Sequence, residues 1–455
     1  MWNEELLLTT ALGRRLYHEV AAALPVIDFH NHLAVADLAA DRRFDDLYAL
    51  WVAPDHYKHR AMRICGVPER LISGDAPADE KFRAWAEILP KLAGNPLYHW
   101  TQFELKRVFG IDEALSPATA EAIRSRANAM LATPEFSARK LLKRFNVVYS
   151  APCAAPTDPL DGFASIPGTV PSFRGDELVS PTLESVRKLA AITGEEVGDF
   201  AGFRRAVGKR LDDFHTAGCR IADHALDDGF RYLTVDKKVA EALFQRLLGG
   251  TFDDADRPLL ASAVLQMLLG EYAKREWLLQ LHIGAHRRTS TRLRKTLGMA
   301  GGFAGIGHPC DIDSLVTLLD DAECGECGLP RTILYTLNPA DHAAFAVLAG
   351  AFAGDGVPGK VQLGPAWWYC DHLEGMRDHF EKAAAYGVLS QFIGMTTDSR
   401  SLLSFVRHEY FRRALCGWLG TKAERGEMPD DFATLSGLVR AVCYENAKNY
   451  IGVQP

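Results

Sequence analysis

The segment Val26-Ile27-Asp28-Phe29-His30-Asn31-His32 joins a short apolar run to two histidines that are two residues apart. Side chains of an extended chain point alternately to opposite faces, so His30 and His32 share one face and Asn31 points to the other. A strand that ends in this way can present two imidazoles to one metal ion. It can equally be a polar strand end with two exposed histidines. The residues that favour the metal lie far downstream, at 397–400.

Short apolar runs recur along the rest of the chain, each followed by enough sequence for a helix. Together with residues 26–30 they make eight predicted strands, the others being 147–149, 169–174, 219–223, 278–282, 332–335, 360–363 and 392–395. Alternating strands and helices predict a parallel sheet, and eight such units predict a closed (β/α)8 barrel of the TIM type.

Residues 34–146 follow the first predicted strand and have the apolar spacing of helices. This stretch is too long for one crossover. We therefore interpret it as a large helical insertion within a single metal-dependent barrel domain of residues 1–455.

Polar residues fall at the predicted C-terminal ends of the strands. In barrels of this type those ends meet at one mouth, where the catalytic residues are found. We therefore predict a single site that gathers His30, His32, Arg174, Asp223, His282, Trp367, Trp368, Asp398 and Arg400.

The composition of the chain indicates which kinds of partner and which cellular compartment to expect. The 455 residues are 48% hydrophobic and carry a formal net charge of -7, which does not suggest a nucleic-acid partner. No apolar run approaches the ~20 residues that span a bilayer, and the N-terminus lacks the basic start of a secretory signal. Nine scattered cysteines do not look like a disulfide framework, so we expect a cytoplasmic protein. No glycine fingerprint follows a strand, so no nucleotide cofactor is expected.

Seven motifs follow one another along the whole chain. They are Asp28–Leu33, Asp55–Lys58 with Arg60–Arg63, Gly94–Trp100, Cys219-Arg220 with Asp223-His224, Gln280–Ala285, Ala366–Trp368, and Thr397–Ser401 with Arg407–Arg413. In this order they resemble the uronate isomerase (glucuronate isomerase) family of the amidohydrolase superfamily. The resemblance implies a distorted (β/α)8 barrel with a helical insertion, in agreement with the pattern of strands.

The resemblance also implies an activity and a cofactor. Members of the family are aldose-ketose isomerases that interconvert D-glucuronate with D-fructuronate and D-galacturonate with D-tagaturonate. By resemblance, His30, His32 and Asp398 would hold one divalent metal, expected to be Zn2+, with Mn2+ as an alternative. Asp223 stands where related hydrolases carry a metal-bridging lysine, which favours one metal over two. We expect the only partners to be the hexuronate and further copies of the chain in a homo-oligomer.

Aldose-ketose isomerisation sets clear demands on the site. A base must remove the C2 proton, the charge on two oxygens must be stabilised, and a proton must reach C1. A metal can serve as the Lewis acid for both oxygens. Asp398 and Tyr57 are both candidates for the base, and Arg174 would lower the pKa of Tyr57 if the two pair. By resemblance, His56 is a further catalytic candidate, and the expected substrate contacts are Arg400, Arg174, Asp223 and Trp367. His282 would be either a further metal ligand or a substrate contact.

Some features leave alternatives open. In the family the second strand usually ends in a threonine-aspartate-aspartate-proline run, but here residues 151–156 read Ala-Pro-Cys-Ala-Ala-Pro, so two acids are missing. This change favours, as one alternative, an isomerase of another acidic sugar. A metal-dependent hydrolase of a lactone or amide would need the same histidines and aspartate and is a second alternative. A non-catalytic sugar-acid binder is a third, but it would require a missing ligand, and His30, His32 and Asp398 are all present. His308, Cys310, Cys324 and Cys327 could form a small zinc site, although reduced surface cysteines are the favoured interpretation.

Overall fold

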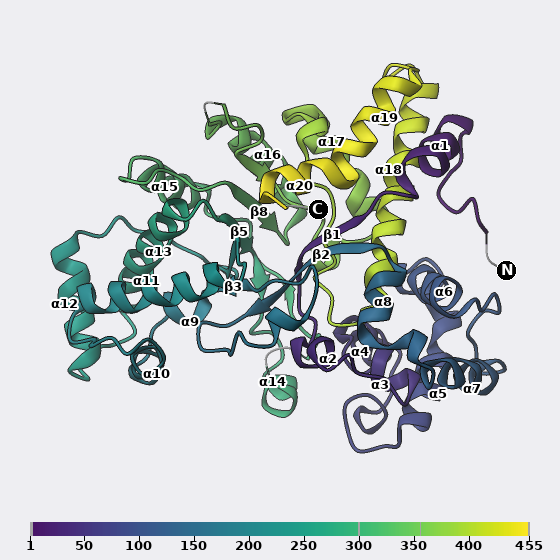
Figure 1. Ribbon diagram of the computed structural model, residues 1–455, viewed down its shortest axis with the longest axis horizontal. Helices are drawn as coiled ribbons and strands as arrows, with labels where there is room; N and C mark the ends of the chain where they lie inside the picture. The colour runs from purple at the N-terminus through teal and green to yellow at the C-terminus, as the bar shows by residue number, and fades with distance from the viewer. Residues whose placement is uncertain (1–2, 299–300, 355, 454–455) are drawn as a thin grey trace.

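A curled parallel sheet forms the centre of the molecule (Figure 1). In the computed structural model, which describes residues 3–298, 301–354 and 356–453, this sheet has seven strands in the order β1-β2-β3-β4-β5-β8-β9. Each strand therefore pairs with the next one along the chain that joins the sheet. The strands are β1 (Val26–Asn31), β2 (Val147–Ala154), β3 (Ser172–Arg174), β4 (Ile221–Ala225), β5 (Leu278–Ile283), β8 (Thr332–Thr336) and β9 (Val361–Leu363).

The prediction of an eighth strand at 392–395 is wrong. Residues 392–399 form no regular strand, but they lie between the two edges of the sheet. The Ile393 amide donates to Oε1 of Gln362 in β9 at 3.0 Å, and the Asp398 amide donates to the carbonyl of His30 in β1 at 3.0 Å. Gly394 interrupts a regular ladder because its φ is +94° and a Cβ there would lie 2.1 Å from a carbonyl oxygen. An irregular segment thus takes the eighth position.

Seven α-helices separate β1 from β2 in the described chain. Their shared core includes the fully buried aromatic side chains of Trp51, Phe82, Trp85 and Phe103. Asp55 caps one of these helices by accepting hydrogen bonds from the amides of Tyr57 and Lys58, which fixes the helix start at His56. The helices are α2 (Val35–Ala39), α3 (Leu47–Trp51), α4 (His56–Ile64), α5 (Ala78–Ile88), α6 (Pro96–Phe109), α7 (Ala120–Leu131) and α8 (Ala138–Arg144).

The remaining helices cover the outside of the sheet and the two ends of the chain (Figure 1). They are α1 (Ala11–Arg15), α9 (Asp176–Val179), α10 (Leu183–Thr193), α11 (Phe200–Thr216), α12 (Lys237–Leu248), α13 (Arg257–Lys274), α14 (Thr291–Leu297), α15 (Ile312–Glu323), α16 (His342–Ala351), α17 (Leu373–Tyr386), α18 (Val406–Glu424), α19 (Phe432–Arg440) and α20 (Asn446–Ile451). A separate antiparallel ribbon of β6 (Ala285–His286) and β7 (Gly305–Ile306) flanks α14. No helix in the described ranges has the length and apolar character needed to cross a membrane.

Candidate active site

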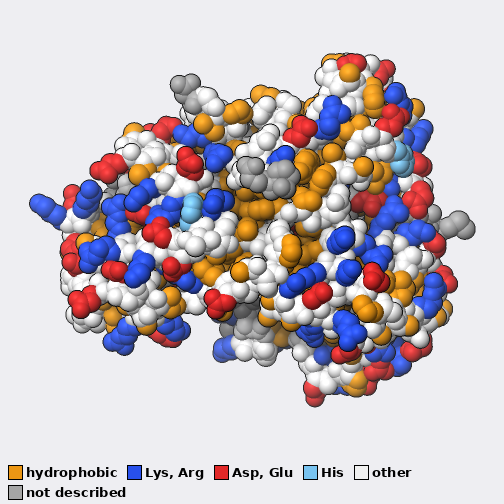
Figure 2. Space-filling model, in the orientation of Figure 1, with side chains coloured by type: hydrophobic (Ala, Val, Ile, Leu, Met, Phe, Trp, Pro, Cys, Tyr) orange, Lys and Arg blue, Asp and Glu red, His pale blue; other side chains and the backbone are white. Residues whose placement is uncertain are grey.

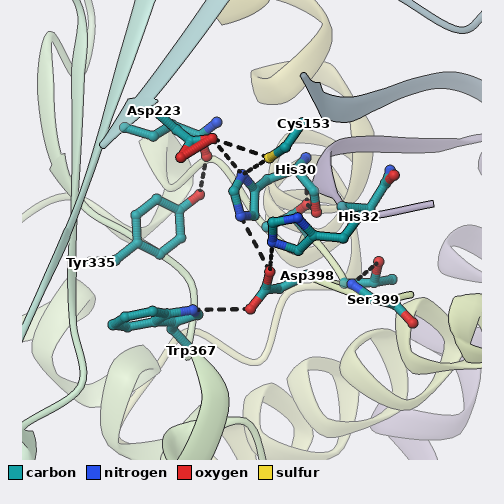
Figure 3. Close-up of polar contacts among 12 residues, drawn as sticks. His30, His32, Cys153, Asp223, Tyr335, Trp367, Asp398 and Ser399 are labelled. Atoms are coloured by element: carbon teal, nitrogen blue, oxygen red, sulfur yellow. Dashed lines mark hydrogen bonds and ion pairs between the residues drawn. The ribbon is translucent and has the colours of Figure 1, made fainter. Parts of the chain in front are cut away.

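Two imidazoles and one carboxylate meet at the edge where β1 adjoins residues 396–399 (Figure 3). His30 belongs to β1 and His32 follows its last residue. Their Nε2 atoms lie 3.2 and 3.0 Å from the same oxygen, Oδ1 of Asp398. Asn31, in contrast, donates to Asp28 and to Ser150 and does not join this group.

The second oxygen of Asp398 is held by two indoles. Trp367 and Trp368 donate their Nε1 protons to Oδ2 over 3.0 and 2.6 Å. Trp368 and Asp398 have φ values of +46° and +48°, which non-glycine residues adopt rarely and at a cost of order 1–3 kcal/mol. Such strained residues cluster at functional sites, where the surrounding structure holds them in place.

The charges around the two histidines favour a positive species there. Burial alone lowers the pKa of His32, but the negative charge that Cys153 and Asp398 can carry outweighs burial and raises it to about 9. The same balance holds the pKa of His30 well above its usual range. Burial would raise the pKa of Asp398, yet the hydrogen bonds from both imidazoles keep it well below the ordinary value. The acidic groups therefore stabilise positive charge at the imidazole pair, and a bound cation would supply such a charge.

A thiol and a second carboxylate lie on the other side of His30. Sγ of Cys153 is 3.6 Å from Nδ1 of His30 and 3.1 Å from Oδ2 of Asp223, and Asp223 pairs with Arg174 over 2.8 Å. Single donor atoms of His30, His32 and Cys153 lie within 4.8 Å of one another, which makes them a candidate metal-binding group. From the sequence we predicted that two acids are missing in this region, but we did not predict that Cys153 belongs to the site. Its position at the end of the second strand was the available signal.

His282 is a neutral aromatic neighbour of this group. Its side chain is buried, and neither ring nitrogen has a hydrogen-bond partner in the described structure. The ring stacks on Tyr335 with the centroids 4.3 Å apart and lies 4.6 Å from the ring of His30. Burial and the charge at His30 hold the pKa of His282 well below its usual value. Both nitrogens are therefore free to meet a ligand.

Helix α4 brings two more predicted residues to the site. The His56 ring stacks on Tyr57 at 4.3 Å and meets Trp368 edge-on at 5.9 Å. Burial and the nearby Arg400 lower the pKa of His56 to about 4, so it is neutral at pH 7. The hydroxyl of Tyr57 is buried and has no hydrogen-bond partner within the described ranges.

The suggested pairing of Arg174 with Tyr57 is wrong. Nε of Arg174 binds Asp176 and its Nη1 binds Asp223, each at 2.8 Å. Burial, followed by the charge of Asp398, raises the pKa of Tyr57 well above its usual value. Tyr57 is therefore a phenol at neutral pH.

The alternative zinc site near the CxxC sequence finds no support. Within the described ranges, His308, Cys310, Cys324 and Cys327 belong to no set of three or more such donors that is close enough for a metal. Cys324 and Cys327 are exposed, as is His308, and all nine cysteines of the chain are free. This agrees with the interpretation of reduced surface cysteines.

Known proteins match this chain over nearly its whole length. The family model described as glucuronate isomerase matches residues 1–451. A curated uronate isomerase from Salmonella paratyphi B is 43% identical over an alignment 467 residues long that covers 99% of each protein. The crystal structure of a uronate isomerase from Thermotoga maritima superposes with a TM-score of 0.92 at 30% identity, covering 99% of both chains. That of a glucuronate isomerase from Caulobacter crescentus has a TM-score of 0.91 at 25% identity, covering 100% of this chain and 98% of its own. These superpositions confirm the predicted α/β class.

Proposed function

The chain belongs to the glucuronate isomerase family, and on that premise we propose that it interconverts a hexuronate with its ketose by proton transfer at C2. D-glucuronate and D-galacturonate are the proposed aldoses, and D-fructuronate and D-tagaturonate the ketoses. The observation that supports this most directly is the convergence of His30, His32 and Asp398, which could hold a divalent cation beside a carboxylate base.

The donor atoms fit such a cation in both spacing and charge. Bonds of 2.0–2.1 Å in a tetrahedral zinc site place neighbouring ligand atoms roughly 3.3 Å apart. The imidazole nitrogens stand 3.2 and 3.0 Å from Asp398 Oδ1, close to that spacing, and the raised pKa values of both histidines indicate a preference for positive charge. A divalent cation held there would supply Lewis-acid stabilisation of charge that develops on the substrate oxygens. We propose Zn2+, with Mn2+ as the alternative.

Asp398 is the proposed base at C2. Its pKa is low enough for the carboxylate to be ionised at neutral pH, and its Oδ2 atom is oriented by the indoles of Trp367 and Trp368. The carboxylate can take the proton from C2 and return it to C1 while the substrate passes through an enediol. Because the positions of both oxygens are fixed before the substrate arrives, little reorganisation is needed for the transfer.

Tyr57 is the proposed proton donor to a substrate oxygen. Its buried hydroxyl lacks a partner within the described structure, and its raised pKa keeps the proton in place. A buried hydroxyl without a partner is costly unless a ligand satisfies it. We propose that the enediol oxygen accepts this hydrogen bond.

Arg400 is the proposed partner of the substrate carboxylate in the site. It is half-buried, and within the described ranges its guanidinium makes no ion pair. Arg174, the other candidate, already binds two aspartates and is better suited to holding Asp223. A free guanidinium can bind a carboxylate through two parallel hydrogen bonds.

The test is an isomerase assay on the purified protein. With Zn2+ or Mn2+ supplied, incubation with D-glucuronate or D-galacturonate should yield the ketose, and the Asp398→Asn variant should lose nearly all of this activity. Absence of a ketose from every hexuronate tested would refute the assignment. Hydrolysis of lactones or amides without isomerisation would favour the hydrolase alternative.

A further inference from the structure

The segment that follows β5 carries a concentration of positive charge. Residues 286–295 read His-Arg-Arg-Thr-Ser-Thr-Arg-Leu-Arg-Lys, with five arginines or lysines and no acid, in a chain whose net charge is -7. On the face drawn in Figure 2, by contrast, positive and negative side chains are interspersed. We call this group, consisting of Arg287, Arg288, Arg292, Arg294 and Lys295, the cationic rim.

The inner end of the rim touches the candidate active site. Arg287 lies over the ring of Trp368, with its guanidinium carbon 5.0 Å from the ring centroid, and the indole of Trp368 binds Asp398. The Nε atom of Arg287 donates to Asp227 over 2.6 Å. A cavity of about 420 Å³ is lined by Arg287 and Arg174 together with their partners Asp227 and Asp176. Cavities of this size hold small-molecule ligands in many proteins.

The loop after α14 packs on the helix that carries His56 and Tyr57. Arg60 of α4 donates to the carbonyl of Ala304 over 3.3 Å, and Arg63 donates to the carbonyl of Gly301. Gly302 has a φ of +79°, and a Cβ there would lie 2.4 Å from the carbonyl oxygen of His56. This close approach fixes the rim segment beside α4.

The outer cations of the rim are not neutralised. Arg288, Arg292 and Lys295 are exposed, and in the described part of the chain none of them pairs with an acidic side chain. Like charges held close together repel one another and disfavour the folded state. A passing anion would relieve that repulsion, and the positive potential would raise the local concentration of the anion.

We propose that the cationic rim attracts the carboxylate of the substrate and passes it along Arg287 into the active site. This inference rests on the proposed function, because the rim can assist the reaction only if the substrate carries a negative charge. It assigns the rim to substrate entry and leaves the chemical step to the residues around Asp398.

The test compares two triple variants with equal charge. The rim variant carries Arg288→Gln, Arg292→Gln and Lys295→Gln. The control carries Arg187→Gln, Lys237→Gln and Lys238→Gln, which remove three exposed charges from α10 and α12. The kcat and kcat/KM for D-glucuronate are measured at about 0.01 M and about 1 M salt, where the Debye length is about 30 Å and about 3 Å. Thermal melting checks that both variants fold.

In low salt the rim variant should lose roughly threefold to tenfold in kcat/KM at unchanged kcat, because electrostatic attraction acts before the chemical step. In high salt it should match the parent, and the control should match the parent at both concentrations. An equal loss of kcat/KM in the rim variant and the control, or a loss of kcat/KM that persists in high salt, would refute the role of the rim. Either result would leave the isomerase assignment intact. A parent protein without isomerase activity would instead refute the proposed function and the inference with it.

Discussion

Tyr57→Phe should make the protein less active and no less stable. The Tyr57 hydroxyl is buried and has no hydrogen-bond partner within the described ranges. The next residue in the chain, Lys58, is also fully buried. Removing a buried hydroxyl without a partner recovers its desolvation cost, so we expect a gain of about 1 kcal/mol in the free energy of unfolding. Unfolding entropies of about 2.1 cal/mol/K per residue convert this gain into a rise in Tm of only about 1 °C for a chain of 455 residues. The shift of the urea midpoint relative to the parent is a second measurement of the same gain.

The same substitution should lower kcat about 10²- to 10³-fold, because it removes one donor to a charge that develops only during the reaction. The ground state gains nothing from this donor, so KM should change little. The measurement is ketose formation from D-glucuronate by the metal-loaded variant.

Tyr48→Phe is the matched control. The hydroxyl of Tyr48 is also buried but donates to the carbonyl of Ile72 over 2.9 Å. Its removal should cost about 1 kcal/mol of stability and leave kcat unchanged. If Tyr57→Phe destabilises the protein as much as Tyr48→Phe does, the Tyr57 hydroxyl has a structural partner. If it retains parental kcat, Tyr57 is not the donor.

Two further predictions concern the metal and the core. His30→Ala and His32→Ala should each lose bound metal and activity together, and full metal retention in the double variant, measured by elemental analysis, would contradict the proposed ligands. Lys58→Met should cost about 3–5 kcal/mol at pH 7, because the ammonium lies 2.5 Å from Asp55 and 3.7 Å from Glu104, two carboxylates that would be left unpaired. In the parent, Lys58 helps lower the pKa of Asp55 to about 2, so this stabilisation is present above about pH 4 and is lost as the pH falls toward 2. Without Lys58, the carboxyl groups of Asp55 and Glu104 should have raised pKa values, so the loss of stability relative to the parent should become smaller as the pH falls. A loss of stability that does not change with pH in urea titrations would contradict this account.

Local sequence was enough to predict seven strands because each is a short apolar run that becomes buried in a parallel sheet. The same reasoning failed at 392–395, which is equally apolar. There the conformation is set by tertiary contacts, since the Ile393 amide bonds to the side chain of Gln362 and Gly394 packs against the carbonyl of Val442. Apolar spacing contains no information about either contact.

The convergence of His30, His32 and Asp398 follows from strand order, and it could be predicted from the sequence. The partners of Arg174 could not, because the arginine had several acids within reach and the choice depends on exact side-chain placement. Cys153 was missed for a related reason. A cysteine near the end of a strand usually packs as a small apolar residue, and only the positions of Asp223 and His30 make it part of a polar site.

The absence of a regular strand at 392–395 and the geometry of the candidate site have a common physical origin. A regular strand at 392–399 would continue a ladder of backbone hydrogen bonds with β1 and would point alternate side chains to opposite faces of the sheet. Asp398 keeps one backbone hydrogen bond to β1, from its amide to the carbonyl of His30, but its φ of +48° accompanies a placement in which its two carboxylate oxygens reach the imidazoles and the indoles. The cost of this conformation is offset by the four polar contacts that the carboxylate makes. At this position the tertiary contacts of the carboxylate therefore override the local preference for a strand, as is common at functional sites.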